Sequence, residues 1–401
     1  MIDTTNIFGG IAMLEKIKIP AALQITIDDL GWHDGRDLRE IGQGSRSGLP
    51  RFHAVEDYTM MNELGKAINQ KILGFLCLAD WDKDNILRGE VGITHDPYGW
   101  DRASTIDMDY ARACFAEMEK SEYIEYGVHT VSHGRYDEQG KRITEREIVE
   151  KGADGEWRPI SAADLDRRLN LFFKIYNSWG FKQKPTVYRE PASTPEKITP
   201  AELRELNLVL NRHGIRHFST NWAYCHDKRE ILTYPVLYSA MNRRVAVAAE
   251  WDEYNFDVSK LPDVMLSGEK NLWPCLVLHW TNFLRREPKE NLEYLKPWVD
   301  YFMRQSEIFG LMISRDYGFY FNQQMYYQFA KIEETDGGFV IDLSEMPKLP
   351  DDILKNEFYI SLENGIEPPK IAGGKIELYE EKQSFKTYKI TDFGEKIEIK
   401  V

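Results

Sequence analysis

Two histidines separated by three residues, His129 and His133, have a spacing that points to chemistry. They begin and end the segment HTVSH, and residues four apart lie on one face of a helical turn. Imidazole nitrogens at this spacing commonly bind zinc or another borderline divalent cation. Structural or exposed histidine pairs are also common, so the spacing alone leaves both interpretations open. Gly127 before the pair and Gly134 after it favour the metal interpretation.

Two adjacent carboxylates, Asp28 and Asp29, follow the apolar run ITI. Neighbouring side chains of an ideal strand point to opposite faces, so both can reach one rim only where the strand turns into a loop. One carboxylate can then bind a metal while the other holds or deprotonates a water molecule. The alternative is an aspartate pair that caps a loop.

Asp29, His129 and His133 together would bind a metal and leave coordination positions for water, which is the pattern of catalytic sites. A divalent cation lowers the pKa of its bound water toward about 7 and polarises a carbonyl group. Asp28 is then the natural general base. His279, at the end of LVLH, is the best general acid by type and position, and a core histidine is the alternative.

These residues need elements that bring distant segments together. Short apolar runs, which predict strands, alternate with longer amphipathic segments, which predict helices. Continuous apolar strands of this kind favour a parallel α/β architecture. The expected strands are 21–27, 71–79, 123–130, 185–190, 216–222, 273–280 and 310–317, and the expected helices are 162–179, 200–213 and 288–310.

The candidate residues all fall at the C-terminal ends of expected strands. In a parallel barrel, that rim is where the active site is built. The residues with this placement are Asp28, Asp29, His129, Arg189 and His279.

Local signals mark the ends of the expected helices. Ser161 is placed to cap residues 162–179, with Asp164 three residues later as its partner. Gly214 is placed to end the helix 200–213. Pro297 predicts a kink or a split within 288–310.

The chain after about residue 333 changes in character. Polar and apolar residues alternate there, and turn signals separate the runs, which predicts half-buried antiparallel strands. We therefore expect a small β-sandwich-like module at 335–401 after a catalytic domain at 1–334. For this module, a packing role is favoured over sugar or partner binding. The aromatic run 318–329 predicts barrel-closing core.

The composition excludes several classes of protein. The 401 residues include 51 Lys and Arg against 65 Asp and Glu, and the formal net charge of -14 argues against a nucleic-acid partner. No apolar run of about 18 residues occurs, so we expect neither a transmembrane helix nor a membrane partner. Walker A, GxGxxG and GxSxG motifs are absent from the sequence, which disfavours nucleotide enzymes and serine esterases.

The N-terminus lacks the features of a signal peptide. We therefore expect a cytoplasmic protein, or a secreted one if a signal peptide has been removed. Free core thiols are favoured over a disulfide framework, because the four cysteines are widely scattered. The oligomeric state stays open. The cysteines are Cys77, Cys114, Cys225 and Cys275.

The segments TIDD, HTVSH, YREP and LVLH occur in the same order as the motifs of the polysaccharide deacetylase family, also known as the NodB homology domain or carbohydrate esterase family 4. The sequence resembles that family over roughly residues 20–320. The resemblance implies a distorted (β/α) barrel, usually of seven strands. It also implies removal of N- or O-acetyl groups from chitin-like polymers, peptidoglycan or xylan.

The resemblance assigns a role to each candidate residue. It implies that Asp28 is the catalytic base, that Arg189 orients this base, and that His279 is the catalytic acid. The implied ligands of the metal are Asp29, His129 and His133. It also places Asn221-Trp222 where the family has a groove aromatic.

Aromatic side chains in the expected loops suit a sugar substrate, because their faces stack on sugar rings. The candidates for substrate binding are Trp32, Tyr98 and Trp222. Each such aromatic taken singly is more often a packing residue. The same alternatives apply to His33, Trp81 and Trp100, which lie in the long segments 31–70 and 80–105 that predict loops over the rim.

The sequence departs from the family pattern in two motifs. Leu30 follows the Asp pair where the family usually has glycine, and Ala192-Ser193-Thr194 follow Arg189-Glu190-Pro191 where the family usually has a glycine close by. Glu190 could also pair with the Arg189 guanidinium. The candidate metal ligands and the order of the motifs lead us to predict a metal-dependent carbohydrate deacetylase that acts on N-acetyl groups. We expect it to bind one Zn²⁺, with Co²⁺, Ni²⁺ or Mn²⁺ as alternatives. The remaining alternatives are an amide or imide hydrolase on the same scaffold and a non-catalytic carbohydrate-binding protein.

Overall fold

The computed structural model describes residues 16–31, 53–192, 194–195, 197–220, 235–240, 257–261, 263, 273–365 and 369–400. The chain divides into two compact units. The central unit comprises residues 24–264 and 273–303, and the terminal unit comprises residues 1–23, 265–272 and 304–401. The predicted division at residues 334 and 335 stays a prediction.

The fold is α/β, and its main sheet is an incomplete barrel of parallel strands, as predicted. Seven strands follow the order β11-β10-β9-β4-β3-β2-β12, and every neighbouring pair is parallel. No pairing joins β11 to β12 within the described residues, so the row stays open there. The strands are β2 (Ala22–Leu30), β3 (Ile72–Cys77), β4 (Ile124–Thr130), β9 (Val187–Tyr188), β10 (His217–Thr220), β11 (Leu237–Ala240) and β12 (Cys275–His279).

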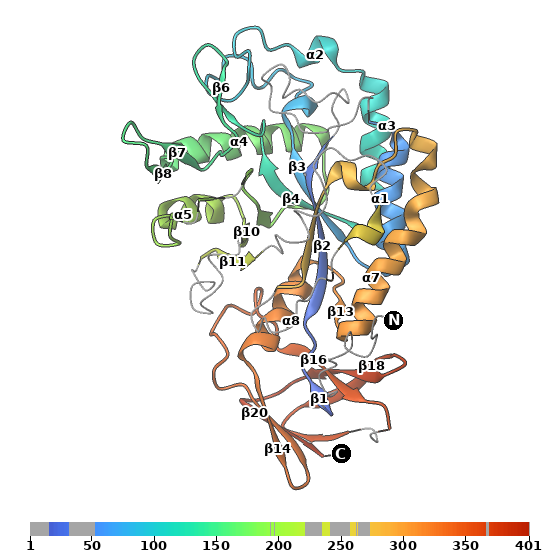
Figure 1. Ribbon diagram of the computed structural model, residues 1–401. Helices are drawn as coiled ribbons and strands as arrows, with labels where there is room; N and C mark the ends of the chain where they lie inside the picture. The colour runs from blue at the N-terminus through green and yellow to red at the C-terminus, as the bar shows by residue number, and fades with distance from the viewer. Residues whose placement is uncertain are drawn as a thin grey trace, which may run out of the picture. The chain divides into compact units, whose positions relative to one another are not determined.

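Strands β2 and β3 of this sheet are buried along their whole length, with all nine residues of β2 and all six of β3 buried. Continuous apolar strands are expected where helices cover a parallel sheet. In Figure 1, α1 and α3 lie side by side on one side of β2–β4, and α4 and α5 lie on the other. These helices are α1 (Val55–Ile68), α3 (Met108–Glu119), α4 (Ala162–Trp179) and α5 (Arg204–Arg212).

Helix α4 has the boundaries that the sequence predicts. The Ser161 side chain accepts a hydrogen bond from the backbone N–H of Asp164 at 3.1 Å, which caps the first turn. Gly180 ends the helix with φ 80°, a left-handed conformation that glycine adopts without a steric penalty. Both ends are therefore fixed by local chemistry.

The segment 288–310 is split, in agreement with the signal from Pro297. A 3-10 helix, η8 (Pro288–Tyr294), leads directly into α7 (Leu295–Phe309). Pro297 falls in the first turn of α7, where its missing N–H costs no helical hydrogen bond.

The two expected loops contain more regular structure than the sequence suggests. The prediction of a loop at 31–70 is wrong for its second half, which forms α1, and residues 32–52 lie outside the described residues. In 80–105, the Asp82 carboxylate accepts from the backbone of Ile86 at 2.7 Å and from the Trp100 indole at 2.8 Å. This segment begins within η3 (Ala79–Trp81) and ends in α2 (Arg102–Thr105).

Two small hairpins that we did not predict follow β4. Each is a two-stranded antiparallel ladder that lies between the end of β4 and the start of α4. Their strands are β5 (Arg135–Tyr136), β6 (Arg142–Thr144), β7 (Val149–Lys151) and β8 (Trp157–Pro159).

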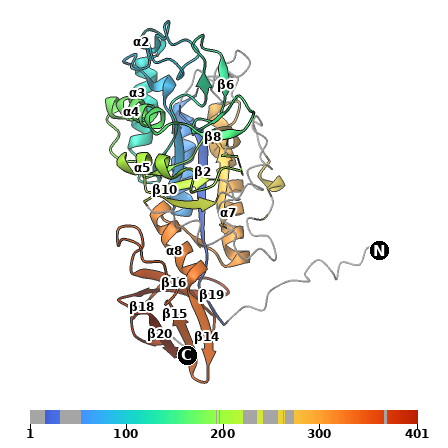
Figure 2. The same ribbon diagram turned by 90° about the vertical axis from the view of Figure 1, so that its left-hand side faces the viewer.

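The C-terminal strands of the terminal unit form a β-sandwich-like module, as predicted. Two antiparallel four-stranded sheets have the orders β1-β16-β19-β18 and β14-β15-β20-β17, and Figure 2 shows β14, β15 and β20 together. Apolar side chains of both sheets share one core. The strands are β1 (Ile17–Lys18), β14 (Lys331–Thr335), β15 (Gly338–Asp342), β16 (Glu357–Glu363), β17 (Lys370–Ala372), β18 (Lys375–Glu381), β19 (Phe385–Thr391) and β20 (Lys396–Lys400).

Two further elements of the terminal unit involve the start of β2 and the aromatic run 318–329. Strand β13 (Met312–Ile313) pairs in parallel with Ala22–Leu23. The aromatic run lies in α8 (Tyr317–Phe329), most of which is buried. Gln323 of this helix donates to the Pro20 carbonyl at 2.8 Å. The sequence missed β1, which adds the N-terminal segment to the sheet of β16.

Two sequence-based expectations concern the whole chain. Within the described residues, no helix is both long and apolar enough to cross a membrane. Cys77, Cys114 and Cys275 are buried free thiols, as expected, and Cys225 lies outside the described residues.

Candidate metal centre

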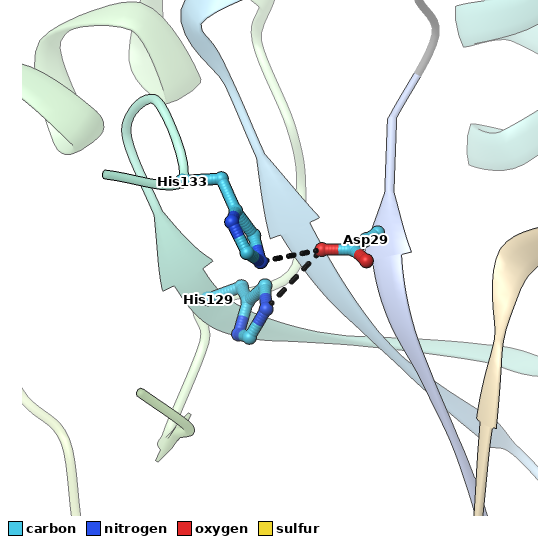
Figure 3. A group of neighbouring side chains, drawn as sticks. All are labelled: Asp29, His129 and His133. Carbon is cyan, nitrogen blue, oxygen red and sulfur yellow. Dashed lines mark ion pairs between the residues drawn. The ribbon is translucent and has the colours of Figure 1, made fainter. Parts of the chain in front are cut away.

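Asp29, His129 and His133 converge on one point in the central unit (Figure 3). The Oδ1 atom of Asp29 lies 3.3 Å from Nε2 of His129 and 3.3 Å from Nε2 of His133. All three side chains are buried, and their ligand atoms lie within 4.8 Å of one another. The structure thus brings together the three residues that the sequence predicts as metal ligands.

The distances between these atoms fit a bound cation. Zinc binds histidine nitrogen and carboxylate oxygen at about 2.0–2.2 Å, so two ligand atoms on a tetrahedral zinc lie about 3.4 Å apart. The two measured separations from Asp29 Oδ1 match this value. Among the described residues, no other cluster of three or more His, Cys, Asp or Glu side chains meets the same criterion.

Asp29 is positioned by a bulge in β2. Ile27 pairs with Gly74 of β3 and Leu30 pairs with Leu76, so β2 uses one residue more than β3 over this interval. Asp29 has φ 62°, in the left-handed region. A bulge of this kind re-aims a side chain. The prediction that the Asp pair lies at a strand-to-loop turn is therefore wrong, because the pair lies inside the strand.

His129 is positioned by a second bulge, in β4. Leu76 pairs with Val128 and Cys77 pairs with Thr130, which leaves His129 as the extra residue. The two ligands from the sheet thus come from irregular positions of two strands that both pair with β3. Bulges are enriched beside active sites for this reason.

His133 follows β4 in a tight bend, and the prediction of a helical turn for HTVSH is wrong. His133 has φ 53°, and its backbone N–H donates to the Thr130 hydroxyl at 3.0 Å. A threonine hydroxyl that accepts this bond offers the backbone an alternative to a helix. The four-residue spacing therefore brings the imidazoles together by another route, with ring centroids 5.3 Å apart.

The tautomer of His129 is fixed by its second nitrogen. Nδ1 lies 2.8 Å from the backbone carbonyl oxygen of Arg189. A carbonyl oxygen only accepts hydrogen bonds, so Nδ1 carries the proton and Nε2 of the neutral ring presents a lone pair toward Asp29. A cation bound between Nε2 and Asp29 Oδ1 would use this lone pair. This arrangement is the usual outer support of a metal-binding histidine.

The electrostatics of the centre reflect the close contact of its carboxylate with its imidazoles. Burial raises the pKa of Asp29, but His133 and His129 hold that pKa well below its usual range. Burial lowers the pKa of His129, but its hydrogen bond to Asp29 and the charge of Asp28 raise it above its usual value. The carboxylate and the imidazoles therefore each stabilise the charged form of the other.

Arg189 holds Asp28 beside the three candidate ligands. Its Nη1 donates to Asp28 Oδ1 at 2.7 Å and to the Thr26 hydroxyl at 3.0 Å, and its Nη2 donates to the Ser219 hydroxyl at 2.6 Å. The guanidinium lies over the Phe75 ring, 4.4 Å from the ring centroid, and Arg189 is fully buried. These contacts restrict Asp28 to one orientation.

His279 lies next to Asp28 in the sheet. Strand β12 pairs with β2 in a register that sets the Cα of His279 against the Cα of Asp28. The His279 backbone N–H donates to Asn282 Oδ1 at 2.8 Å, which fixes the end of the strand. The predicted base and the predicted acid therefore come from adjacent strands.

Glu190, the neighbour of Arg189 in the sequence, forms hydrogen bonds with threonines. Its Oε1 accepts from the Thr194 N–H at 2.7 Å, the Thr194 hydroxyl at 2.9 Å and the Thr220 hydroxyl at 2.8 Å. Burial raises the pKa of Glu190. These bonds connect the loop after β9 to the end of β10.

One neighbour of the centre was missed by the sequence analysis. The Cys77 thiol lies 3.7 Å from Asp29 Oδ1 and can donate a weak hydrogen bond to it. Burial, followed by the charge of Asp29, raises the pKa of this thiol well above its usual value. Cys77 is the last residue of β3, and this position at a strand end could have identified it as a candidate from the sequence.

The predicted aromatic residues have different outcomes. Tyr98 is 72% exposed, so its ring is accessible to a ligand. Trp32 and Trp222 lie outside the described residues, as does His33. Trp81 and Trp100 are buried and serve packing, the role that is more common for single aromatics.

Comparisons with known proteins give only distant similarities. No family model matches the chain, and no curated protein matches it. The chain is similar to a provisionally named polysaccharide deacetylase from Mycobacterium smegmatis, with 12% identity and a TM-score of 0.36 over 69% of this chain and 82% of the other. It is also similar to a provisionally named glycoside hydrolase/deacetylase from Parabacteroides distasonis, with 11% identity and a TM-score of 0.41 over 92% and 84%.

A third similar structure is a GH57-type branching enzyme from the hyperthermophilic archaeon Pyrococcus horikoshii, with 10% identity and a TM-score of 0.35 over 73% of this chain and 69% of the other. Because identities are this low and every one of these TM-scores is below 0.5, the similarities do not assign a family or an activity.

Proposed function

We propose that this protein is a metal-dependent hydrolase that removes acetyl groups, N-acetyl groups first, from a carbohydrate. The observation that carries the proposal is the convergence of Asp29, His129 and His133 with atoms at metal-ligand separations, beside a carboxylate, Asp28, that Arg189 holds in place. The order of TIDD, HTVSH, YREP and LVLH along the chain supports the same activity.

The proposed chemistry divides between the cation and the protein. A divalent cation, Zn²⁺ or alternatively Co²⁺, Ni²⁺ or Mn²⁺, supplies an acidified water molecule and a polarised carbonyl group. Asp28 accepts the proton of the attacking water at Oδ2, because Oδ1 is bound to Arg189. His279 donates a proton to the amine or alcohol that leaves.

The decisive assay compares metal content with acetate release. The protein is stripped with a chelator, reloaded with zinc and incubated with N-acetylated chito-oligosaccharides. His129→Ala is expected to lose both zinc and acetate release, because the site then has two ligands. Full turnover of the chelated wild-type protein would reject the mechanism.

Asp28→Asn separates metal binding from catalysis. Asparagine keeps the shape of the side chain but cannot take a proton, so the variant is expected to retain its zinc and to lose about 10²–10⁴-fold in turnover. Asp109→Asn, at an exposed position, is the matched control and is expected to behave like the wild type. Equal turnover of Asp28→Asn and the wild type would remove Asp28 from its role.

The same assay includes small cyclic imides and acetylated xylan. Acetate release from xylan but not from chito-oligosaccharides would assign O-acetyl groups. Hydrolysis of imides without acetate release would replace the proposal by an amide hydrolase. Sugar binding without any turnover would indicate a carbohydrate-binding protein.

A further inference from the structure

A buried ion pair lies directly behind the segment that carries His133. Arg168 belongs to α4, and Glu147 precedes β7; both are almost fully buried, and Nη1 of Arg168 lies 3.7 Å from Oε1 of Glu147. Removing two charges from water costs free energy, so a buried pair is weak evidence for stability by itself. The contacts that this pair makes with the backbone are therefore informative.

The pair binds both polar backbone groups of Gly134, the residue after His133. Oε1 of Glu147 accepts from the Gly134 N–H at 3.2 Å, and Nη1 of Arg168 donates to the Gly134 carbonyl at 3.4 Å. The N–H belongs to the peptide group that joins His133 to Gly134. A shift of this peptide group would move the His133 side chain.

His133 needs such support because of its backbone conformation. A φ of 53° is unfavourable for a residue with a Cβ atom and persists only where the surroundings impose it. A Cβ atom added to Gly134 would lie 3.1 Å from the carbonyl oxygen of Thr144 in β6, so the hairpin also packs closely there. The bend is thus enclosed on more than one side.

Arg168 is itself held in a fixed position. Its Nη2 donates to the Gly92 carbonyl at 3.0 Å, and its Nε donates to Asp164 at 3.3 Å in the first turn of α4. A guanidinium with several fixed partners has little freedom to follow the backbone that it binds. Helix α4 therefore transmits its position to Gly134.

We propose that Arg168 and Glu147 form a positioning pair that fixes the peptide group between His133 and Gly134, and thereby sets the metal affinity of the candidate centre. This inference rests on the proposed metal site and names residues that do not touch the metal. Partners that orient metal ligands commonly change the affinity for the ion by about 10–100-fold when they are removed.

Two substitutions of Glu147 test the pair. Glu147→Leu removes the acceptor of the Gly134 N–H, and the dissociation constant for zinc is expected to rise about 10–100-fold. Glu147→Gln keeps an oxygen in the same place, so it is expected to restore an affinity close to that of the wild type. The constants are measured by competition with a chromophoric chelator. The visible spectrum of the cobalt-loaded protein reports separately on ligand geometry.

Glu150 offers a matched control three residues away. Its exposed carboxylate pairs with the side chain of Arg135 at 2.9 Å, whereas Glu147 binds the backbone of Gly134. Glu150→Leu is therefore expected to keep the zinc affinity and the cobalt spectrum of the wild type. A spectrum that changes in Glu147→Leu and not in Glu150→Leu would separate positioning from a general effect of losing a carboxylate.

The other outcomes distinguish a failure of the proposed function from a failure of the positioning pair. If the wild type binds no metal, the proposed function fails; if it binds and a folded Glu147→Leu protein has the same affinity and spectrum, only the positioning pair fails. If Glu147→Leu does not fold, the double variant Glu147→Leu/Arg168→Leu is used in its place, because it leaves no unpaired charge at this pair. Wild-type affinity in that double variant, or failure of both to fold, would overturn the inference.

Discussion

Cys77 shows how a single residue near the candidate centre is controlled by its surroundings. Its thiol touches the same oxygen of Asp29 that faces both imidazoles. A thiolate there would repel the carboxylate, and the raised pKa keeps the proton on sulfur. The residue therefore acts as a neutral hydrogen-bond donor, and we expect low reactivity.

The first prediction concerns that reactivity. Iodoacetamide reacts with thiolates, so Cys77 in the folded protein is expected to stay unmodified at a pH of about 8, near the ordinary pKa of cysteine, and to react fully after unfolding. Peptide mass mapping of both samples measures the difference. Modification of Cys77 in protein that keeps its native circular dichroism would contradict the raised pKa.

At the residue scale, the sequence was sufficient to identify the main candidates. Aspartate and histidine at the ends of strands are residue types that commonly bind metals, and Asp29, His129 and His133 do converge. Ser219 and Thr26 were not predicted, because hydroxyl groups are common and only the packing of β9, β10 and β2 reveals that they bind Arg189.

At the element scale, glycine in β4 controls the aromatic support of Arg189. A Cβ atom added to Gly127 would lie 2.6 Å from the ring of Phe75, far inside contact distance. That ring carries the guanidinium of Arg189 on its face. The absence of a side chain at Gly127 is therefore linked to the orientation of Asp28 through Phe75 and Arg189.

The second prediction tests this link. Gly127→Ala is expected to displace Phe75, to lower turnover while zinc binding is kept, and to cost about 1–3 kcal/mol of unfolding free energy through overpacking. Acetate release and urea denaturation measure the two effects. The matched control is Gly394→Ala, where no atom lies within 4 Å of the added Cβ and little change is expected. Unchanged turnover in Gly127→Ala would break the link.

The strands were predictable at this scale, but their irregularities were not. The expected strands at 123–130 and 273–280 correspond to β4 and β12 within a few residues. Bulges displace an alternating pattern by one residue, and a strand that is buried on both faces has no alternation to displace. The bulges at Asp29 and His129 therefore left no trace in the apolar runs. The helical turn assigned to HTVSH came from the spacing of its two histidines alone.

At the scale of the whole molecule, the terminal unit combines both ends of the chain. Strand β1 has only two residues, Ile17 and Lys18, and pairs with β16 more than 300 residues later. A run of two residues carries no periodicity, so the sequence could not predict this pairing. Strands such as β15 and β20 do show alternation, and the strands after β14 were predicted as a module.

The third prediction concerns the pH dependence of global stability. His217 in β10 is buried, and burial, with a smaller effect of Arg216, lowers the pKa of His217 to about 3. Between this value and the ordinary histidine pKa, the unfolded chain binds a proton that the folded protein does not. The contribution of His217 to stability is therefore lost as the pH falls below about 6.5.

A variant without this titration measures the effect. His217→Gln is neutral in both states, so the wild type should lose about 2 kcal/mol more unfolding free energy than the variant between about pH 7 and about pH 5. Urea denaturation of metal-free samples at both pH values gives the two differences, and other titrating groups cancel in the comparison. Equal losses in the two proteins would show that the pKa of His217 is not lowered in the folded protein.

The contact between His129 Nδ1 and position 189 uses the main chain, whereas the contact with Asp28 uses the guanidinium. A substitution of Arg189 would therefore remove its contact with Asp28 while the His129 imidazole keeps its tautomer, since every amino acid has a backbone carbonyl group. If the proposed function holds, a single substitution of Arg189 would abolish turnover and leave the three candidate ligands, Asp29, His129 and His133, in place.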